Sequence, residues 1–361
     1  MKKKFLLLSL SLFLCFAPST VLSQEAAGSK NSFVNPLRPG ADPFIMKEEG
    51  KYYTIWSNGR GFTVTESRFL TRFEREEKVW SPPKDAWNSF NLWAPEIHPI
   101  GDKWYIYYAA SVHNGAPFFA QRTGVLEADS PFGPYLDKGV IYTGEDTVGK
   151  KENLWAIDMT VLEVNGKYYA VWSGWDDQYD HHDVDQNLYI AEMENPWTIG
   201  KRVLLSQPEL DWEKGDHISL LEGPQILKHQ EDVFILYSTR GSWTEHYKMG
   251  QLRLRSADHD PLDPTSWIKS PQPLFKGNHR VFGVGHASVT TSPDDKEHWI
   301  YYHSKLAKDG GWNNRHVFLQ PFTFGEDGNP VFGEARGSGQ LMRPSGEVKI
   351  ESESEEPAIL P

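Results

Sequence analysis

The sequence predicts an all-β protein built as a five-bladed β-propeller, with four-stranded antiparallel blades around a central channel. Three observations support this prediction. One short sequence pattern recurs five times along the 361 residues, and its copies are far enough apart to hold four strands each. No 11-residue stretch shows convincing helical periodicity, which argues against folds that alternate strands with helices.

Each copy of the pattern joins two β-prone segments through a turn, as a β-hairpin does. The third copy runs from Asp158-Met159-Thr160-Val161 through Asn165-Gly166 to the aromatic segment Lys167-Tyr168-Tyr169-Ala170-Val171-Trp172-Ser173. The copies begin at residues 42, 94, 158, 222 and 286, at intervals of 52, 64, 64 and 64 residues. These intervals suit four strands and their loops per blade.

The first residue of each copy is expected to lie at the mouth of the channel, because the first strand of a propeller blade lines the channel. These positions hold Asp42, Ala94, Asp158, Glu222 (one residue early, with Gly223 inserted) and His286. Four of the five are ionisable. A convergent cluster of carboxylates is unfavourable unless chemistry or a cation uses it, so we expect a functional site rather than a structural polar plug.

Such carboxylates can hydrolyse an acetal, since one protonates the leaving oxygen and another activates water. Glu222 is expected to be the general acid, because apolar neighbours such as Leu221 and Pro224 would help it to keep a proton near neutral pH. Asp42 is expected to be the base. Asp158 would raise the pKa of the acid and orient it.

Four motifs carry a family resemblance: Gly40-Ala41-Asp42-Pro43, Trp155-Ala156-Ile157-Asp158, Leu221-Glu222-Gly223-Pro224 and Gly285-His286. In this order and spacing they resemble glycoside hydrolase family 43, the five-bladed inverting enzymes that act on arabinans and xylans. The resemblance extends from Asn35 to about Arg343. It implies that Asp42 is the base, Asp158 the pKa modulator and Glu222 the acid.

Further phrases are similar to the exo-acting α-L-arabinofuranosidases of subfamily 26, which release arabinose from α-1,5-linked arabino-oligosaccharides. These phrases are Asn91–Glu96, Ile157–Val161, Val171–Trp175 and Pro261–Trp267. Two features depart from the family pattern. Ala287 follows His286 where a polar Asn is expected, and the third copy is followed by an acidic, histidine-rich stretch at residues 175–185. That stretch is either a cation site or a solvated loop that shapes the pocket.

The remaining candidate site residues have alternative roles. His286 is similar to a channel histidine that holds calcium or a hydrated cation in many family members, or it is a channel histidine without metal; the chemistry itself requires no cofactor. Arg315 is similar in position to a substrate-contacting arginine, or it forms a surface ion pair. Trp93 and Trp175 are either sugar-stacking platforms or core residues.

The chain ends predict export. Three lysines and an apolar run from Phe5 to Phe16 indicate a signal peptide over residues 1–23, leading to the periplasm or the exterior. Residues 24–34 are expected to be a linker, 35–345 the catalytic propeller and 346–361 an acidic tail. The single cysteine, Cys15, lies in the signal, and no later stretch is apolar enough to predict a membrane span.

The charge balance indicates the class of partner. Without the three signal lysines the chain has 34 basic and 49 acidic side chains, a net charge of −15. This charge repels nucleic acids and other polyanions, so a neutral partner is expected. The family resemblance implies that this partner is a plant-type oligosaccharide or polysaccharide.

Three other functions remain open at this stage. A β-xylosidase or an endo-arabinanase could use the same scaffold. Retaining, fructan-cleaving propellers usually have Asn before the first carboxylate and Asp-Pro in the third blade, where this chain has Ala41 and Met159. A non-catalytic sugar-binding propeller would need no pair of acid and base.

Overall fold

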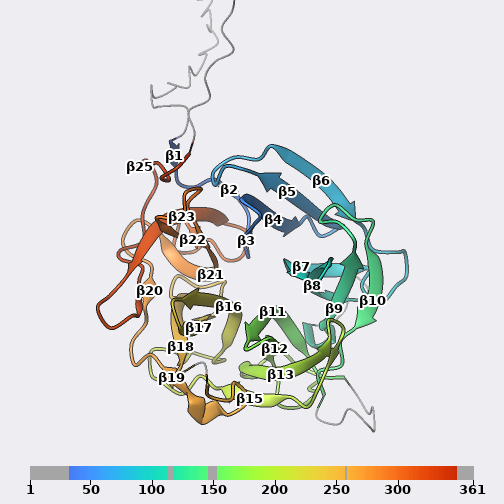
Figure 1. The fold of residues 1–361 in the computed structure, drawn as a ribbon. Helices are drawn as coiled ribbons and strands as arrows, with labels where there is room; N and C mark the ends of the chain where they lie inside the picture. Colours follow the sequence, from blue (N-terminus) through green and yellow to red (C-terminus); the bar gives the residue numbers. More distant parts are fainter. Residues whose placement is uncertain (1–31, 113–117, 145–152, 257, 348–361) are drawn as a thin grey trace, which may run out of the picture.

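The computed structural model describes residues 32–112, 118–144, 153–256 and 258–347. Strands dominate this part of the chain, and its helices are two short 3₁₀ turns, η1 (Phe118–Ala120) and η2 (Pro264–Ser266). Neither turn has the length or the apolar composition to cross a membrane. Figure 1 shows five antiparallel sheets arranged as blades around a central axis, which confirms the predicted five-bladed propeller.

Each blade starts with an inner strand at the channel and continues outward through antiparallel neighbours. Blade 1 consists of β3 (Phe44–Glu48), β4 (Lys51–Ser57), β5 (Phe62–Ser67) and β6 (Arg75–Trp80). Blade 2 consists of β7 (Phe90–Ile100), β8 (Lys103–Ser111), β9 (Arg122–Ala128) and β10 (Leu136–Val140).

Blades 3 and 4 each have an outer strand divided into two pieces. Blade 3 consists of β11 (Ala156–Val164), β12 (Lys167–Gly174) and β13 (Asn187–Asn195), with β14 (Thr198–Ile199) and β15 (Val203–Ser206) both paired to β13. Blade 4 consists of β16 (Leu221–His229), β17 (Asp232–Thr239) and β18 (Lys248–Leu254), with β19 (Trp267–Lys269) and β20 (Phe275–Lys276) both paired to β18.

Blade 5 is completed from the other end of the chain. Its strands β21 (Phe282–Thr291), β22 (His298–Lys305) and β23 (Arg315–Phe324) are followed at the outer edge by β24 (Pro330–Val331) and by the N-terminal β2 (Arg38–Pro39). We call residues 35–39, which include β2, together with their hydrogen bonds to β23 the clasp. The amide of Leu37 donates to the carbonyl of Val317 at 2.8 Å, and the Asn35 side chain bonds both backbone groups of Leu319 at 2.9 Å. The clasp therefore closes the ring.

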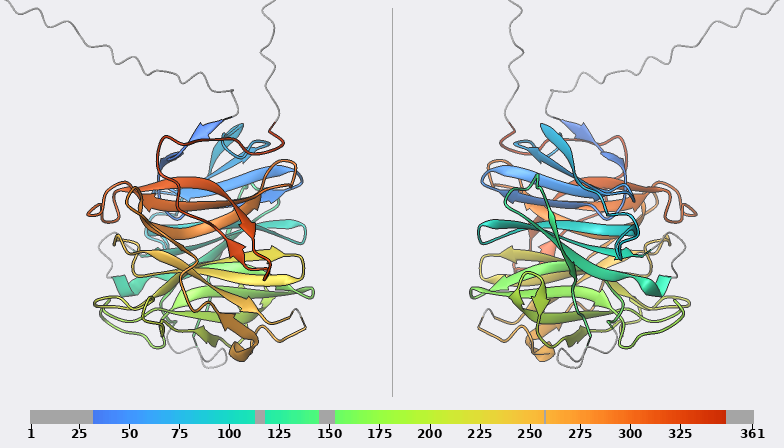
Figure 2. Two further views of the ribbon diagram at one scale, coloured as in Figure 1. Left: turned by 90° about the vertical axis from the view of Figure 1, so that its left-hand side faces the viewer. Right: turned by 90° about the vertical axis from the view of Figure 1, so that its right-hand side faces the viewer.

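The two chain ends also meet outside the blades. In Figure 2 the blue N-terminal strand β1 (Phe33–Val34) lies beside the red C-terminal segment, where it pairs with β25 (Leu341–Met342). Glu347 is buried and accepts a hydrogen bond from the amide of Leu70 at 3.1 Å. The folded domain thus begins before residue 35 and extends past residue 345, and the expected signal peptide lies outside the described residues.

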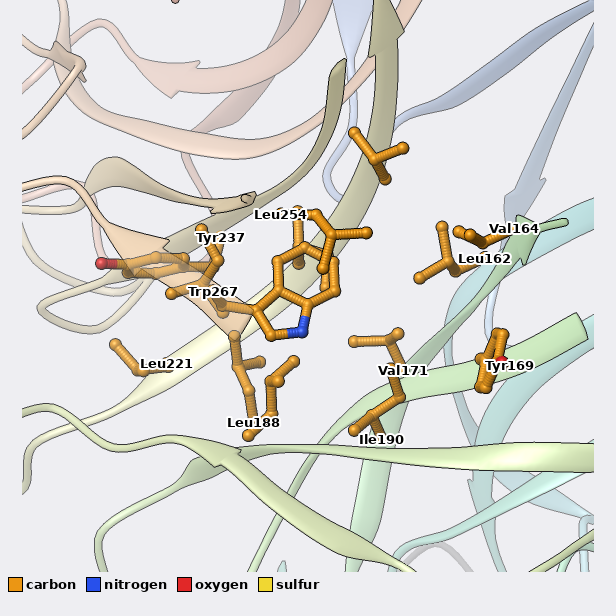
Figure 3. Packing of buried hydrophobic residues seen from close by; sticks show 14 residues of the cluster. Leu162, Val164, Tyr169, Val171, Leu188, Ile190, Leu221, Tyr237, Leu254 and Trp267 are labelled. Atoms are coloured by element: carbon orange, nitrogen blue, oxygen red, sulfur yellow. The ribbon is translucent and has the colours of Figure 1, made fainter. Parts of the chain in front are cut away.

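The core lies between neighbouring blades. Figure 3 shows the cluster between blades 3 and 4, where Leu162, Val171, Leu188, Tyr237 and Trp267 interdigitate. These side chains come from alternate positions of facing sheets, as the period-two pattern of the hairpins requires. Truncating one such side chain to alanine costs about 2–5 kcal/mol of unfolding free energy, so this packing holds the blades at a fixed angle.

All five inner strands turn sharply at the channel mouth. Positive φ angles occur at the repeat position of every blade: Asp42 (49°), Ala94 (41°), Asp158 (56°), Gly223 (56°) and His286 (44°). In blades 3, 4 and 5 the pairing register shifts at this residue, and in blade 2 it does so beside Trp93. Asp and His tolerate this left-handed conformation better than bulkier residues, and glycine adopts it without steric cost.

Candidate active site

A cavity of about 330 Å³ lies where the inner strands converge. Its lining consists of Asp42, Trp93, Phe118, Ile157, Asp158, Gln186, Glu222, Ser242, Trp243, His286, Trp312 and Arg315. It brings together six of the seven site residues expected from the sequence. The exception is Trp175.

Asp42 is surrounded by basic groups. Arg315 Nη1 donates to Asp42 Oδ1 at 3.0 Å, and His286 Nδ1 lies 3.3 Å from the same oxygen. Burial acts to raise the pKa of Asp42, but the charge of Arg315 and the neighbouring imidazoles outweigh it and hold this pKa well below its usual range. Asp42 is therefore ionised throughout the physiological range, as a base must be.

His303, which was not selected from the sequence, contacts Asp42. The backbone amide of Asp42 donates to His303 Nδ1 at 3.2 Å, and the ring stacks on Tyr247 at 5.4 Å. Burial lowers the pKa of His303 to about 3, so the ring is neutral. The repeat contained a signal for it, since His303 occupies the position held by Trp56, Trp172 or Tyr237 in other copies.

Asp158 is buried and accepts a hydrogen bond from the amide of Gly223 at 3.0 Å, through Oδ2. This bond links the inner strands of blades 3 and 4 directly beside Glu222. Burial and the nearby negative charges of Glu222 and Asp42 raise the pKa of Asp158 well above its usual value. Asp158 and Glu222 consequently titrate as an interacting pair.

Glu222 precedes the left-handed Gly223 at the start of β16. Burial raises the pKa of Glu222 to about 7, with a further increase from Asp42, while Tyr247, Arg315 and Ser242 act in the opposite direction. The cavity thus contains an ionised carboxylate, Asp42, and a carboxyl group that keeps its proton near neutral pH, Glu222. This is the combination required to activate water and to protonate a leaving oxygen.

The two tryptophans expected to stack on sugar differ in position. Trp93 is half-buried and lines the cavity, with its ring 5.7 Å from that of Phe118. Trp175 is fully buried and stacks on Trp155 at 4.7 Å, with only 9° between the ring planes. The expectation that Trp175 offers a face to sugar is corrected, because its ring packs behind the cavity wall and has no free face.

The residues around His286 do not fit a calcium site. Calcium prefers six to eight oxygen ligands, whereas the nearest carboxylate, Asp42, is already paired with Arg315 and flanked by imidazoles. Within the described part of the chain, no three His, Cys, Asp or Glu side chains are grouped to hold a metal ion. This finding includes residues 175–185, where Asp176 accepts a hydrogen bond from the Tyr179 hydroxyl at 2.9 Å.

Six further cavity-lining residues were not selected as site residues from the sequence: Phe118, Ile157, Gln186, Ser242, Trp243 and Trp312. Of these, Ser242 and Trp243 follow β17 and Trp312 precedes β23, so these three lie in loops outside the repeated hairpins. Loop residues share no repeat position, and the repeat therefore contained no signal for them.

Comparison with known proteins agrees with this geometry. The extracellular exo-α-(1→5)-L-arabinofuranosidase of Streptomyces avermitilis is 34% identical over an alignment of 319 residues, and this alignment covers 84% of this chain and 63% of that protein. The enzyme of the same name from Streptomyces chartreusis is 31% identical over 305 residues, 79% of this chain and 86% of that one. This chain thus spans less than two thirds of the Streptomyces avermitilis relative.

Solved structures show the same architecture. The crystal structure of an α-L-arabinofuranosidase from Lactobacillus brevis superposes with a TM-score of 0.76 and 34% identity, over 85% of this chain and 98% of that one. The sequence profile of glycosyl hydrolases family 43 matches residues 33–330, from the N-terminal strand to the outer edge of blade 5. With the propeller, the three convergent carboxylates and this match, the chain belongs to glycosyl hydrolases family 43.

Proposed function

We propose that this protein is an inverting exo-α-L-arabinofuranosidase that releases arabinose from α-1,5-linked arabino-oligosaccharides or arabinan. One observation carries the proposal. A single cavity holds the ionised Asp42 together with Glu222, whose pKa is raised to about 7. The similarity to relatives named as arabinofuranosidases supports the choice of sugar.

In the proposed reaction Asp42 accepts a proton from a water molecule as the water oxygen attacks the anomeric carbon. The glycosidic C–O bond breaks, and Glu222 gives its proton to the departing oxygen. Asp158 accepts the amide hydrogen of Gly223 and so fixes the strand on which Glu222 lies. The expected effect of Asp158 on the pKa of Glu222 is not among the causes of that shift, which are burial and the charge of Asp42. A single displacement of this kind inverts the anomeric configuration.

The substrate class follows from the cavity and the charge. A volume of about 330 Å³ is at the small end for ligand pockets, which supports recognition of a terminal sugar. Trp93 offers an aromatic face, and the net charge of −15 after signal removal favours a neutral glycan. We place the substrate among plant-type polysaccharides on the names of the relatives.

We also propose that residues 1–23 direct export and are removed. The lysines and the apolar run of this segment support export, as do the relatives whose names call them extracellular. The mature enzyme would act in the periplasm or outside the cell.

The test is product analysis on linear α-1,5-arabino-oligosaccharides beside a xylo-oligosaccharide panel, with NMR detection of the first anomer released. We expect free arabinose in the inverted configuration, and no turnover by Glu222→Gln. Release of xylose would identify a β-xylosidase and internal fragments an endo-arabinanase. Full turnover by Glu222→Gln would refute the assignment of the acid.

A further inference from the structure

Two tryptophans at the cavity mouth expose a large part of their side chains, although most large apolar residues of this protein are buried. Trp243 is 36% exposed and Trp312 is 53% exposed, and their rings meet edge to face with centroids 5.5 Å apart. Trp243 belongs to blade 4 and Trp312 to blade 5, which are neighbours in the ring (Figure 1). Exposed indoles beside a reactive cavity indicate a binding surface for an apolar ring face.

The pair lies on the side of the general acid. Trp243 directly follows Ser242, whose hydroxyl is close enough to Glu222 to lower the pKa of that group. Trp93, in contrast, comes from blade 2, between Asp42 on blade 1 and Asp158 on blade 3. Since Glu222 protonates the departing oxygen, the leaving sugar must lie beside Glu222. The geometry points to Trp243 and Trp312 as the platform that binds the ring of the leaving sugar.

The platform is built rigidly. Lys305, which is fully buried, donates to the Ser242 carbonyl at 2.6 Å, and Trp312 Nε1 donates to Ser242 Oγ at 3.0 Å. A Cβ on Gly241 would lie 2.7 Å from the Trp243 ring, so this glycine lets the indole fold back over the turn. The platform needs little reordering when a sugar binds.

The same platform is bonded to the base. Arg315 Nε donates to the carbonyl of Trp312 at 3.0 Å, while Arg315 Nη1 donates to Asp42 at 3.0 Å. One chain of hydrogen bonds therefore runs from Asp42 through Arg315 and Trp312 to Ser242. These hydrogen bonds fix the position of the platform relative to the carboxylates. A sugar ring bound on the platform is therefore held with its glycosidic bond next to the carboxylates. We expect its binding energy to increase turnover as well as affinity.

This inference rests on the proposed function, and the test separates the two. The substrates are α-1,5-arabinobiose, whose leaving group is a sugar, and methyl α-L-arabinofuranoside, whose leaving group is too small to cover the platform. Trp312→Ala should lower kcat/KM for arabinobiose, with a fall in kcat, by a factor roughly tenfold or more greater than its effect on kcat/KM for the methyl glycoside. Trp312→Phe, which keeps a ring face without the indole N–H, should retain most of the activity.

A binding measurement provides a readout without turnover. In the Glu222→Gln background, Trp312→Ala should weaken the calorimetrically measured binding of arabinobiose by a larger factor than the binding of arabinose. Equal losses for both substrates, or no loss for arabinobiose, would overturn the platform. Failure of the wild-type enzyme to release arabinose would refute the proposed function instead, and calorimetry with xylobiose and xylose would then test the platform in the same way.

Discussion

Asp42 and Glu222 are both buried carboxyl groups, yet their neighbours move their pKa values in opposite directions. The charge of Arg315 lowers the pKa of Asp42, whereas Glu222 has only hydroxyl groups and a more distant guanidinium to offset its burial. Placement of one arginine thus separates base from acid. Arg315 approaches Asp42 closely enough for a direct 3.0 Å hydrogen bond.

The difference between the pKa values of Asp42 and Glu222 predicts that activity falls only on the alkaline side of the pH profile. Glu222 must be protonated to act, so kcat/KM should fall as the pH rises through about 7. The low pKa of Asp42 keeps the base ionised, so no acidic limb should appear above the pH at which the protein unfolds. A pH–rate series on arabinobiose measures both limbs. A fall in activity near pH 5, while the protein is still folded, would contradict the low pKa of Asp42.

The raised pKa of Glu222 also carries a cost in stability. A group whose pKa is higher in the folded state stabilises the fold most at low pH, and this contribution is lost between pH 4.5 and about 7. The Glu222→Gln variant has no charge to bury at this position. Its unfolding free energy at pH 8 should therefore be about 1–3 kcal/mol higher than that of the wild type. The difference should shrink towards pH 4. Urea unfolding at both pH values is the measurement, and equal stability at pH 8 would contradict the burial argument.

Removal of divalent cations should leave the enzyme active. Arg315 already neutralises Asp42, and the residues around His286 do not form a calcium site. Dialysis against EDTA should change kcat and Tm by no more than the experimental error. A loss of activity restored by calcium, and not by magnesium, would contradict this prediction.

At the scale of elements, a left-handed residue in or just before the inner strand of every blade brings the site together. It occurs where each strand reaches the mouth, and in blades 3 and 4 it places Asp158 and the Glu222–Gly223 pair in contact through one hydrogen bond. In blade 4 the conformation falls on a glycine, and the carboxylate moves one residue earlier. This explains why the acid is out of step with the repeat.

Gly223→Ala tests this arrangement. A Cβ there would lie 3.0 Å from the His286 ring, at a φ of +56° that alanine adopts with strain. We expect a loss of about 1–3 kcal/mol in unfolding free energy and a large loss of kcat. The matched control is Gly166→Ala, at a φ of +73° with nothing within 4 Å, which should cost about 1 kcal/mol and spare activity. Equal effects of the two variants would exclude a role for the contact with His286.

The repeat explains which elements the sequence could predict. Paired β-prone segments around a turn such as Asn165–Gly166 form the inner hairpins, because their pattern is local and recurs five times. The divided outer strands had no such signal because each piece is too short to show a pattern. The clasp had none because β2 pairs with β23, which lies far along the chain. The same distinction applies to the site: carboxylates at a repeat position were found, but Trp312 in a loop was not. The burial of Trp175 depends on its stacking with Trp155, which spacing alone does not reveal.

At the scale of the whole molecule, closure of the ring depends on a few residues of the clasp. Asn35 is buried, and its side chain satisfies both the amide and the carbonyl of Leu319. Asn35→Leu would leave two buried backbone groups without partners, at a cost of about 2–4 kcal/mol. Thermal unfolding should show a Tm lowered by several degrees, with normal activity at low temperature. An unchanged Tm would mean that water replaces the side chain at no cost.

The clasp is also close to the chemistry. Asp42 follows β2 after only Gly40 and Ala41, so the proposed catalytic base lies on the same short segment that closes the ring. A two-residue strand at the edge of a sheet frays more easily than the strands inside it. Heating should therefore release the base while the blades are still folded. The half-life of activity at elevated temperature would then report on fraying of this one segment, and the enzyme would lose turnover before it loses its β-sheet signal.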